Sequence, residues 1–150
     1  MPFSAADLLA IKSELTNDPL TLGLTTNPSD DEANANKLNL VRSQCQVDRE
    51  SIPVSDVVKA IDADEFIALS QPQRDYVALI TNGGSVNPKS GGEVREALLQ
   101  FFGSASETRA SLTLLLTESA SRITQLYKAG TLSYGGQVTP SDVANARNAS

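Results

Sequence analysis

Apolar side chains recur at helical spacing along most of the chain, most clearly between residues 90 and 130. Positions three and four residues apart share one face of a helix, so such a repeat marks a face that is buried. A first stripe consists of Val94, Ala97, Leu98, Phe101 and Phe102. A second stripe consists of Leu112, Leu115, Leu116, Ser119, Ala120, Ile123, Leu126 and Tyr127. Gly130 suits the left-handed residue that follows a helix end. The pattern predicts two consecutive helices that form a central hairpin.

Capping signals predict further helices on both sides of this hairpin. A short polar side chain followed three residues later by an acid or glutamine marks a helix start. Such pairs are Ser4 with Asp7, Ser29 with Glu32, Asp62 with Glu65, Ser70 with Gln73, Ser104 with Glu107 and Thr139 with Asp142. We expect the first helix to stop at Asn17, because Pro19 disfavours helical geometry at the preceding residue. The helix that begins at Ser29 is rich in asparagine, and we expect it to be weak and peripheral.

Two segments lack a helical period. Residues 44–47 lie in a connector and can be extended, and residues 132–138 alternate as a strand or small hairpin would, with a bend at Gly135 and Gly136. The fold class predicted is therefore all-α. We expect a small multi-helix bundle around the central hairpin, with a possible short extended segment or β-hairpin near residues 131–138.

The length of 150 residues suits a single domain. We expect one helical domain over residues 1–150, with one core and a short flexible tail at about 148–150. The start lacks the basic leader and long apolar run of a signal peptide. The sequence contains no run of eighteen apolar residues, so we expect no membrane span.

Charge and residue types exclude several functions. The net charge of −6 argues against a protein that binds nucleic acid by neutralising phosphates. Histidine is absent, which removes the usual general base and the usual transition-metal ligand. The single cysteine, Cys45, cannot form an internal disulfide, and we interpret it as an incidental thiol. We expect no catalytic residue, no cofactor and no metal.

Three constellations invite a chemical interpretation. Residues 83–92 resemble a phosphate-binding loop, but Pro88 stands where a glycine amide is required, so we interpret them as an interhelical turn. The acidic clusters at 30–32 and 62–65 sit at predicted helix starts, where acids are favoured without any catalysis. The arginines on several helices, namely Arg74, Arg95, Arg109 and Arg122, are expected to pair with nearby glutamates or to reach across a contact between chains.

Leu114 and Leu99 project away from the stripes of their helices. Either a neighbouring element of the same chain covers them, or another copy of the chain does. We extend the second alternative to the segment after Gly130. The subunit-interface residues predicted in this way are Leu99, Leu114, Leu132, Tyr134 and Val138.

Several stretches resemble a family of small helical proteins from the structural modules of long-tailed bacteriophages, the neck or head-completion proteins. The resemblance rests on residues 8–24, 49–70, 118–127 and 138–147 and on the Asn87-Pro88 turn. The chain departs from the family at Pro53, where a capping serine or threonine is expected, so the start of the helix after it is in question.

The resemblance implies a structural virion protein that is not an enzyme. Such head-to-tail adaptors, or connectors, assemble as a homo-oligomeric ring, here expected to be a dodecamer, below the portal. The partners implied are the portal protein and a tail-side neck protein, with DNA passing through the ring without sequence-specific binding. The location implied is the neck of the virion, after synthesis in the host cytoplasm. The alternatives are a tail terminator or tail assembly protein, and a small cytosolic helical regulator that binds a partner protein.

Overall fold

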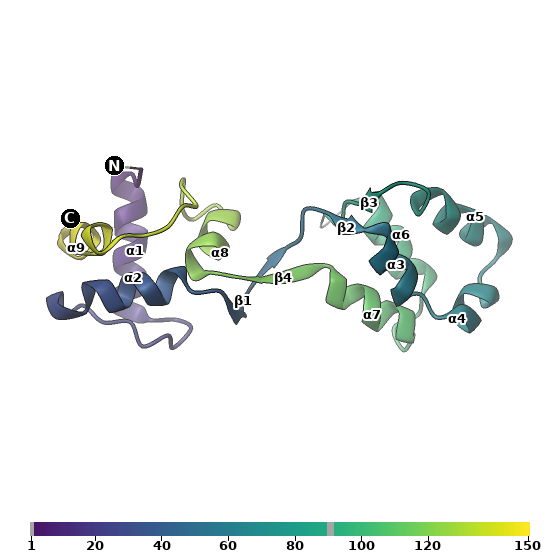
Figure 1. Cartoon of the computed structure of the whole chain (residues 1–150), viewed down its shortest axis with the longest axis horizontal. Helices are drawn as coiled ribbons and strands as arrows, with labels where there is room; N and C mark the ends of the chain where they lie inside the picture. The colour runs from purple at the N-terminus through teal and green to yellow at the C-terminus, as the bar shows by residue number, and fades with distance from the viewer. Residues whose placement is uncertain (1, 90–91) are drawn as a thin grey trace. The chain divides into compact units, whose positions relative to one another are not determined.

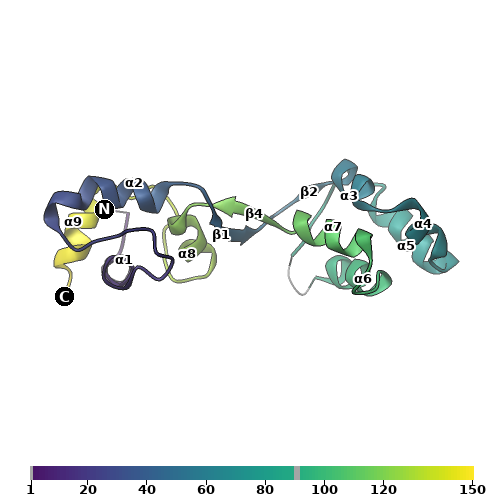
Figure 2. The same ribbon diagram turned by 90° about the horizontal axis from the view of Figure 1, so that it is seen from below.

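The chain folds into two compact units, each with its own hydrophobic core. The computed structural model describes residues 2–89 and 92–150 (Figures 1 and 2). Unit 1 combines residues 1–47 with residues 119–150, and unit 2 comprises residues 48–118. The expectation of one core is wrong, because the two ends of the chain pack together while the residues between them pack on themselves. The single helical domain predicted over 1–150 therefore divides into these two units.

Unit 1 is helical. It contains α1 (Ala5–Asn17), the 3-10 turn η1 (Pro28–Asp30), α2 (Asp31–Asn39), α8 (Arg122–Lys128) and α9 (Pro140–Asn148). The last helix packs against α1 and α2 (Figure 1). The unit therefore depends on contacts between segments that are distant in sequence. Its core consists of Phe3, Leu8, Ile11, Leu15, Leu22, Leu24, Ala35, Leu38, Ile123, Leu126, Leu132, Val138, Val143 and Ala146.

The starts of α1 and α9 are confirmed. Ser4 with Asp7 and Thr139 with Asp142 form complete capping boxes, in which each side chain bonds the other residue's backbone amide. Helix α1 ends at Asn17, as predicted, and the carboxylate of Asp18 then accepts hydrogen bonds from the next turn. The amides that donate to it belong to Leu22, Gly23 and Leu24, which brings this apolar turn back onto the core.

Helix α2 differs from the prediction in its start and in its position. Ser29 lies inside η1, whose cap is Asn27, so the α-helix begins at Asp31. The prediction that this helix is peripheral is wrong, since Leu38 is fully buried in the core of unit 1. Asn34 is also buried, and its amide group bonds both the N–H and the carbonyl of Thr25. Satisfying a buried amide in this way offsets the low helix propensity of the segment.

The described residues of unit 2 form five short helices and one small sheet. The elements are β2 (Ile52–Pro53), α3 (Val54–Ala60), α4 (Ala63–Ala68), α5 (Gln71–Ile80), β3 (Ser85–Val86), α6 (Glu93–Phe101) and α7 (Glu107–Leu115). Strand β2 is antiparallel to β3, with Ile52 opposite Val86. The core consists of Ile52, Val57, Leu69, Val77, Val86, Leu98, Phe102, Leu112 and Leu116. Pro53 precedes α3 without any side-chain cap, so pairing with β3 positions this helix start.

The predicted central hairpin is wrong in its second arm. Helix α7 ends at Leu115, strand β4 (Thr117–Ala120) follows, and α8 begins anew after its own cap, Ser121. The apolar repeat across this stretch is carried only by Ser119 and Ala120, which provide too little apolar surface to keep it helical. The two halves of this predicted second arm belong to different units, α7 to unit 2 and α8 to unit 1. Strand β4 pairs with β1 (Arg42–Asp48), which confirms the extended segment predicted at 44–47. The fold is mostly helical but not purely all-α.

Residues 131–138 contain no paired strand, so the β-hairpin predicted there does not form. Side chains satisfy the backbone instead. Asp7 accepts from the amide of Ser133, and Asn39 bonds both the N–H and the carbonyl of Val138. These contacts fix the segment onto α1 and α2 without a partner strand. The tail predicted at 148–150 is likewise anchored, because α9 extends to Asn148 and the carbonyl of Ala149 accepts from Lys12. No helix in the described part of the chain is long and apolar enough to cross a membrane.

Candidate interaction surfaces

Leu114 is the most exposed of the predicted interface residues. It lies on the outer face of α7, and 80% of its surface is exposed. Leu112, two positions earlier, points into the core of unit 2. Because residues two apart on a helix face nearly opposite directions, Leu114 points away from that core. No other part of its own unit covers it, which removes one of the two explanations offered by the sequence.

The remaining predicted interface residues lie elsewhere. Leu132 and Val138 are buried in the core of unit 1, so the folded chain does not present them to a partner. Tyr134 is partly exposed, and its ring stacks edge-on against Phe3 with centroids 5.0 Å apart. Leu99 is half-buried against the core of unit 2. The structure does not bring these five residues together on one surface.

The N-terminus of α7 is fixed by a carboxylate from α4. Glu65 accepts from the hydroxyl of Ser106 at 2.7 Å and from the amides of Glu107 and Thr108 at 3.0 and 2.9 Å. Hydrogen bonds from Thr108 and Ser106 lower the pKa of Glu65 to about 2. In return, the hydroxyl of buried Thr108 accepts from the amide of Asp62. The start at Ser104 is therefore corrected to Ser106, and α7 holds Leu114 in a fixed direction.

An open apolar groove lies among α3, α4 and α5. Its volume is about 300 Å³, and its lining residues are Val58, Ile61, Ala63, Phe66, Val77, Ala78 and Thr81. Sequence analysis missed this groove, although a signal for it exists. Val57 and Val58 are adjacent on a short helix and point about 100° apart, so they cannot both point directly at the core. The structure buries Val57 and leaves Val58 53% exposed.

Two other hollows in unit 2 are weaker candidates for an interaction site. A cavity of about 20 Å³ inside unit 2 has space for one water, and Leu99 is part of its apolar wall. A more open hollow of about 270 Å³ is bordered by Phe101, Gln73 and Glu65. Both carboxylate oxygens of Glu65 already accept hydrogen bonds from α7. We therefore assign this hollow no separate role.

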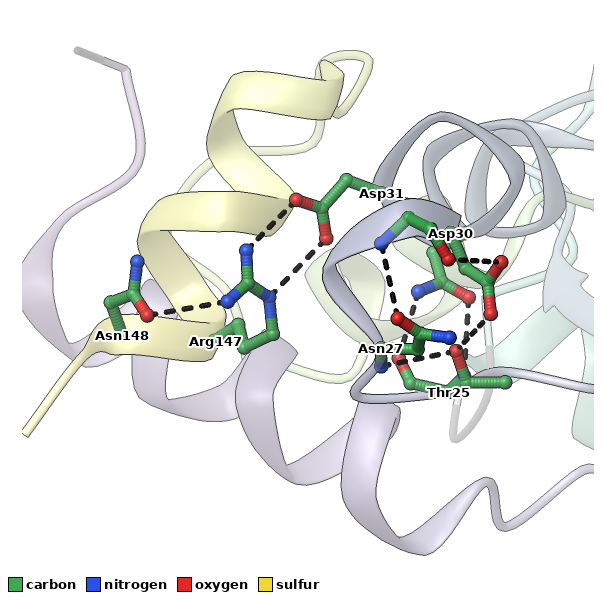
Figure 3. Close-up of polar contacts among 8 residues, drawn as sticks. Thr25, Asn27, Asp30, Asp31, Arg147 and Asn148 are labelled. Atoms are coloured by element: carbon green, nitrogen blue, oxygen red, sulfur yellow. Dashed lines mark hydrogen bonds and ion pairs between the residues drawn. The ribbon is translucent and has the colours of Figure 1, made fainter.

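The acidic clusters lie at helix starts, as predicted, and one of their members also forms an ion pair. Asp62 accepts from the amides of Asp64 and Glu65 at the start of α4. In unit 1, the hydroxyl of Thr25 donates to Asp30, and Arg147 pairs with Asp31 at 3.0 Å (Figure 3). No group of three histidine, cysteine, aspartate or glutamate side chains in the described ranges could hold a metal ion.

The arginines are engaged within the chain. Arg122 pairs with Glu14 through two hydrogen bonds of 2.9 and 2.8 Å, and Arg95 lies 3.9 Å from Asp48. Arg109 donates to backbone carbonyls at the end of α6, and Arg74 donates to the carbonyl of Ile67. Pairing with a glutamate is thus confirmed for Arg122, whereas the partner of Arg95 is an aspartate.

Cys45 is fully buried, and burial raises the pKa of its thiol. This agrees with an incidental thiol. The phosphate-loop candidate includes residues 90 and 91, which lie outside the described residues. Of its described residues, Ser85 and Val86 form β3, and Gly92 immediately precedes α6.

The charge of the molecule is concentrated in unit 2. Eleven acidic and six basic side chains belong to residues 48–118, against seven and six in unit 1. The exposed Leu114, the apolar groove and the acidic surplus thus occur in the same unit. Comparisons with protein-family models, with curated proteins and with solved structures give no match.

Proposed function

We propose that this chain is a structural protein of a tailed-phage virion, a head-to-tail adaptor that forms a ring below the portal and extends the DNA channel toward the tail. The observation that carries the proposal is the apolar surface of unit 2, where an exposed leucine and an apolar groove lie on one small unit. Such surfaces are typical of proteins that act by assembling with other proteins. The sequence resemblance supplies the kind of assembly.

The charge distribution supports the same proposal. DNA that moves through a channel must not adhere to its wall, and an acidic wall repels phosphates. The surplus of acids over bases lies in unit 2. A surface of this charge suits a channel that DNA passes without sequence-specific binding.

The experiment measures the native mass of the purified protein and then its presence in intact virions. We expect a dodecamer in solution or on the portal, and we expect the protein in purified particles. Deleting the coding sequence should leave filled heads without attached tails, and restoring it in trans should rescue them. A hexamer would favour a tail terminator. A monomer or dimer that is absent from particles would contradict the proposal and favour a cytosolic regulator.

A further inference from the structure

We propose that Asn82 is a site of spontaneous covalent modification, at which the side chain cyclises onto the main chain and is then hydrolysed to aspartate and isoaspartate. The site lies in the exposed turn between α5 and β3 of unit 2. The modification needs no partner protein, so it is independent of the proposed ring. A chain that persists after synthesis gains negative charge here and, in part, an altered main chain.

The residue that follows Asn82 favours this reaction. Asn82 is the only asparagine in the sequence that precedes a glycine. Glycine has no Cβ to obstruct the approach of the preceding side chain to its amide nitrogen, and its backbone adopts conformations that other residues avoid. Cyclisation is therefore favoured at Asn82 over every other asparagine of the chain.

The structure leaves both reacting groups open to water. Asn82 and Gly83 are both exposed. Among the described residues, none accepts a hydrogen bond from the Gly83 amide and none bonds the side chain of Asn82. The main-chain amide of Asn82 donates to the carbonyl of Leu79 at 3.4 Å, so the hydrogen bonds at the end of α5 stop just before the reacting amide. Neither group has to be released from a partner, and the folded chain itself is reactive.

The reaction needs only water as a co-reactant. Hydroxide removes the proton of the Gly83 amide, and the nitrogen attacks the side-chain carbonyl carbon of Asn82. A nitrogen–carbon bond forms, the bond from Cγ to Nδ2 breaks, and Nδ2 takes a proton from water and leaves as ammonia. Water then opens the cyclic imide at one of its carbonyl carbons. Opening at the main-chain carbonyl carbon gives isoaspartate, in which the chain runs through Cβ and Cγ, and opening at Cγ gives aspartate.

Isoaspartate would disturb the small sheet beside the turn, because it lengthens the main chain just before β3. The carbonyl of Gly84 accepts from the amide of Val54 at 3.2 Å, and Ser85 lies opposite Pro53. Pro53 provides no side-chain cap, so this hydrogen bond and the strand pair hold the start of α3. The added methylene moves Gly84 relative to Val54 and releases that start. Aspartate leaves the length of the main chain unaltered and has no such effect.

The test follows the full chain by peptide mass spectrometry during incubation in warm, mildly alkaline buffer. Trypsin cleaves after Arg74 and after Lys89. The resulting peptide carries both Asn82 and Asn87, so the two are measured together. Asn87 is exposed as well, but Pro88 follows it and has no amide proton to lose, which makes it an internal control.

We expect Asn82 to gain one mass unit progressively, and faster as the pH rises. Fragmentation by electron transfer should resolve the product into aspartate and isoaspartate, while Asn87 stays unchanged. Equal conversion at the two asparagines, or none at Asn82, would overturn the proposal.

Two glycine variants test which nitrogen attacks. A Cβ at Gly83 would make only an ordinary contact with the Ser85 carbonyl oxygen at 3.8 Å, and one at Gly84 meets nothing within 4 Å, so both alanine variants should fold. Gly83→Ala should slow conversion about tenfold or more, whereas Gly84→Ala should convert within about twofold of wild type. Equal rates in the two variants would contradict attack by the Gly83 amide.

The same chain unfolded in urea shows what the fold contributes. Because the folded turn leaves both groups open, native protein should convert at a rate within about tenfold of that of the unfolded chain. Conversion confined to the unfolded chain would overturn the proposal, since the motif would then be protected by the fold.

Hydrogen exchange tests the effect on α3. In the purified isoaspartate form, the amides at the start of α3 should exchange about fivefold to thirtyfold faster than in wild type, as expected for the loss of one hydrogen bond. The control is Asn82→Asp, which adds the charge to an unchanged main chain and should exchange like wild type. Equal exchange in all three forms would contradict the role assigned to the hydrogen bond between Val54 and Gly84.

Discussion

Unit 1 and unit 2 use polar side chains differently. In unit 1, buried Asp7 and Glu14 bond segments that are far apart in sequence, such as α1 to the segment at Ser133, and buried Asn34 bonds the backbone of Thr25. Unit 2 buries one polar side chain among its described residues, Thr108. It leaves apolar side chains on α3, α4, α5 and α7 at its surface. Unit 1 also exposes large apolar side chains, so the difference lies inside the units: buried polar groups fix the loops of unit 1, whereas unit 2 depends mainly on apolar packing.

The two cores provide the largest test of this division. Ile11→Ala in unit 1 and Leu112→Ala in unit 2 each remove a large buried side chain, and each should cost about 2–5 kcal/mol in the unit that contains it. Hydrogen exchange followed by mass spectrometry should show faster exchange only in the mutated unit. Acceleration in both units by either variant would show that they unfold together.

The next largest effect on stability is expected from two glycines, Gly135 in unit 1 and Gly103 in unit 2, whose surroundings differ. A Cβ at Gly135 would lie 2.5 Å from Cδ1 of the Tyr127 ring in unit 1, whereas one at Gly103 in unit 2 meets nothing within 4 Å. Gly135→Ala should therefore destabilise by about 1–3 kcal/mol, and Gly103→Ala should stay within about 0.5 kcal/mol of wild type. Urea unfolding measures both. Equal effects would mean that the Tyr127 ring moves without cost.

Asp7 in unit 1 and Glu65 in unit 2 have strongly lowered pKa values. Burial alone would raise the pKa of Asp7, but hydrogen bonds from Ser133 and Ser4 outweigh it and lower the pKa to about 2. Hydrogen bonds lower the pKa of Glu65 to about 2 as well. A lowered folded-state pKa stabilises the protein above the ordinary value near 4, and this stability is lost as the pH falls toward 2.

The variants Asp7→Asn and Glu65→Gln should change the acid stability of unit 1 and of unit 2 separately. Asp7→Asn should cost about 1–3 kcal/mol at neutral pH and should reduce the acid sensitivity of unit 1. Glu65→Gln should do the same for unit 2, to a smaller extent because this carboxylate is more exposed. Hydrogen-exchange rates of the amides in each unit, measured between pH 5 and pH 2, report the stability of that unit. If both variants kept the pH dependence of the wild type, Asp7 and Glu65 would not be the source of the acid sensitivity.

The smallest effect concerns the ion pair of Figure 3. Arg147 and Asp31 join α9 to α2 near the surface, so Asp31→Asn should cost about 0–1 kcal/mol and less at high salt. Thermal melting at two salt concentrations checks it. A loss above that of Asp7→Asn would show that this pair fixes α9 more firmly than its geometry implies.

Local signals predicted local structure well. The capping pairs at Ser4, Ser70 and Thr139 and the left-handed turn at Gly130 are confirmed, because each depends on atoms within a few residues. Contacts between distant segments were not predictable in the same way. The break between α7 and α8 follows from which unit each end joins, and an apolar period continues through the break.

For the candidate interaction surfaces too, the sequence predicted local features but not contacts between distant segments. Helical spacing identified Leu114 as a residue off the buried face, and the structure leaves it exposed. The same reasoning could not locate the groove, since its walls come from three helices whose mutual packing the sequence does not state. Alternation at residues 132–138 was misinterpreted because Asp7 and Asn39 supply the backbone partners that a second strand would have supplied.

The 71 residues of unit 2 interrupt the two segments that make unit 1, and this determines the order of events on the ribosome. Residues 48–118 emerge together and can bury their apolar side chains at once. Helix α1 must wait for α9 to be translated before its own apolar face is covered. The nascent N-terminal helices are therefore the part of the chain that a holding chaperone would bind, and a pause in translation before residue 119 would prolong that exposure.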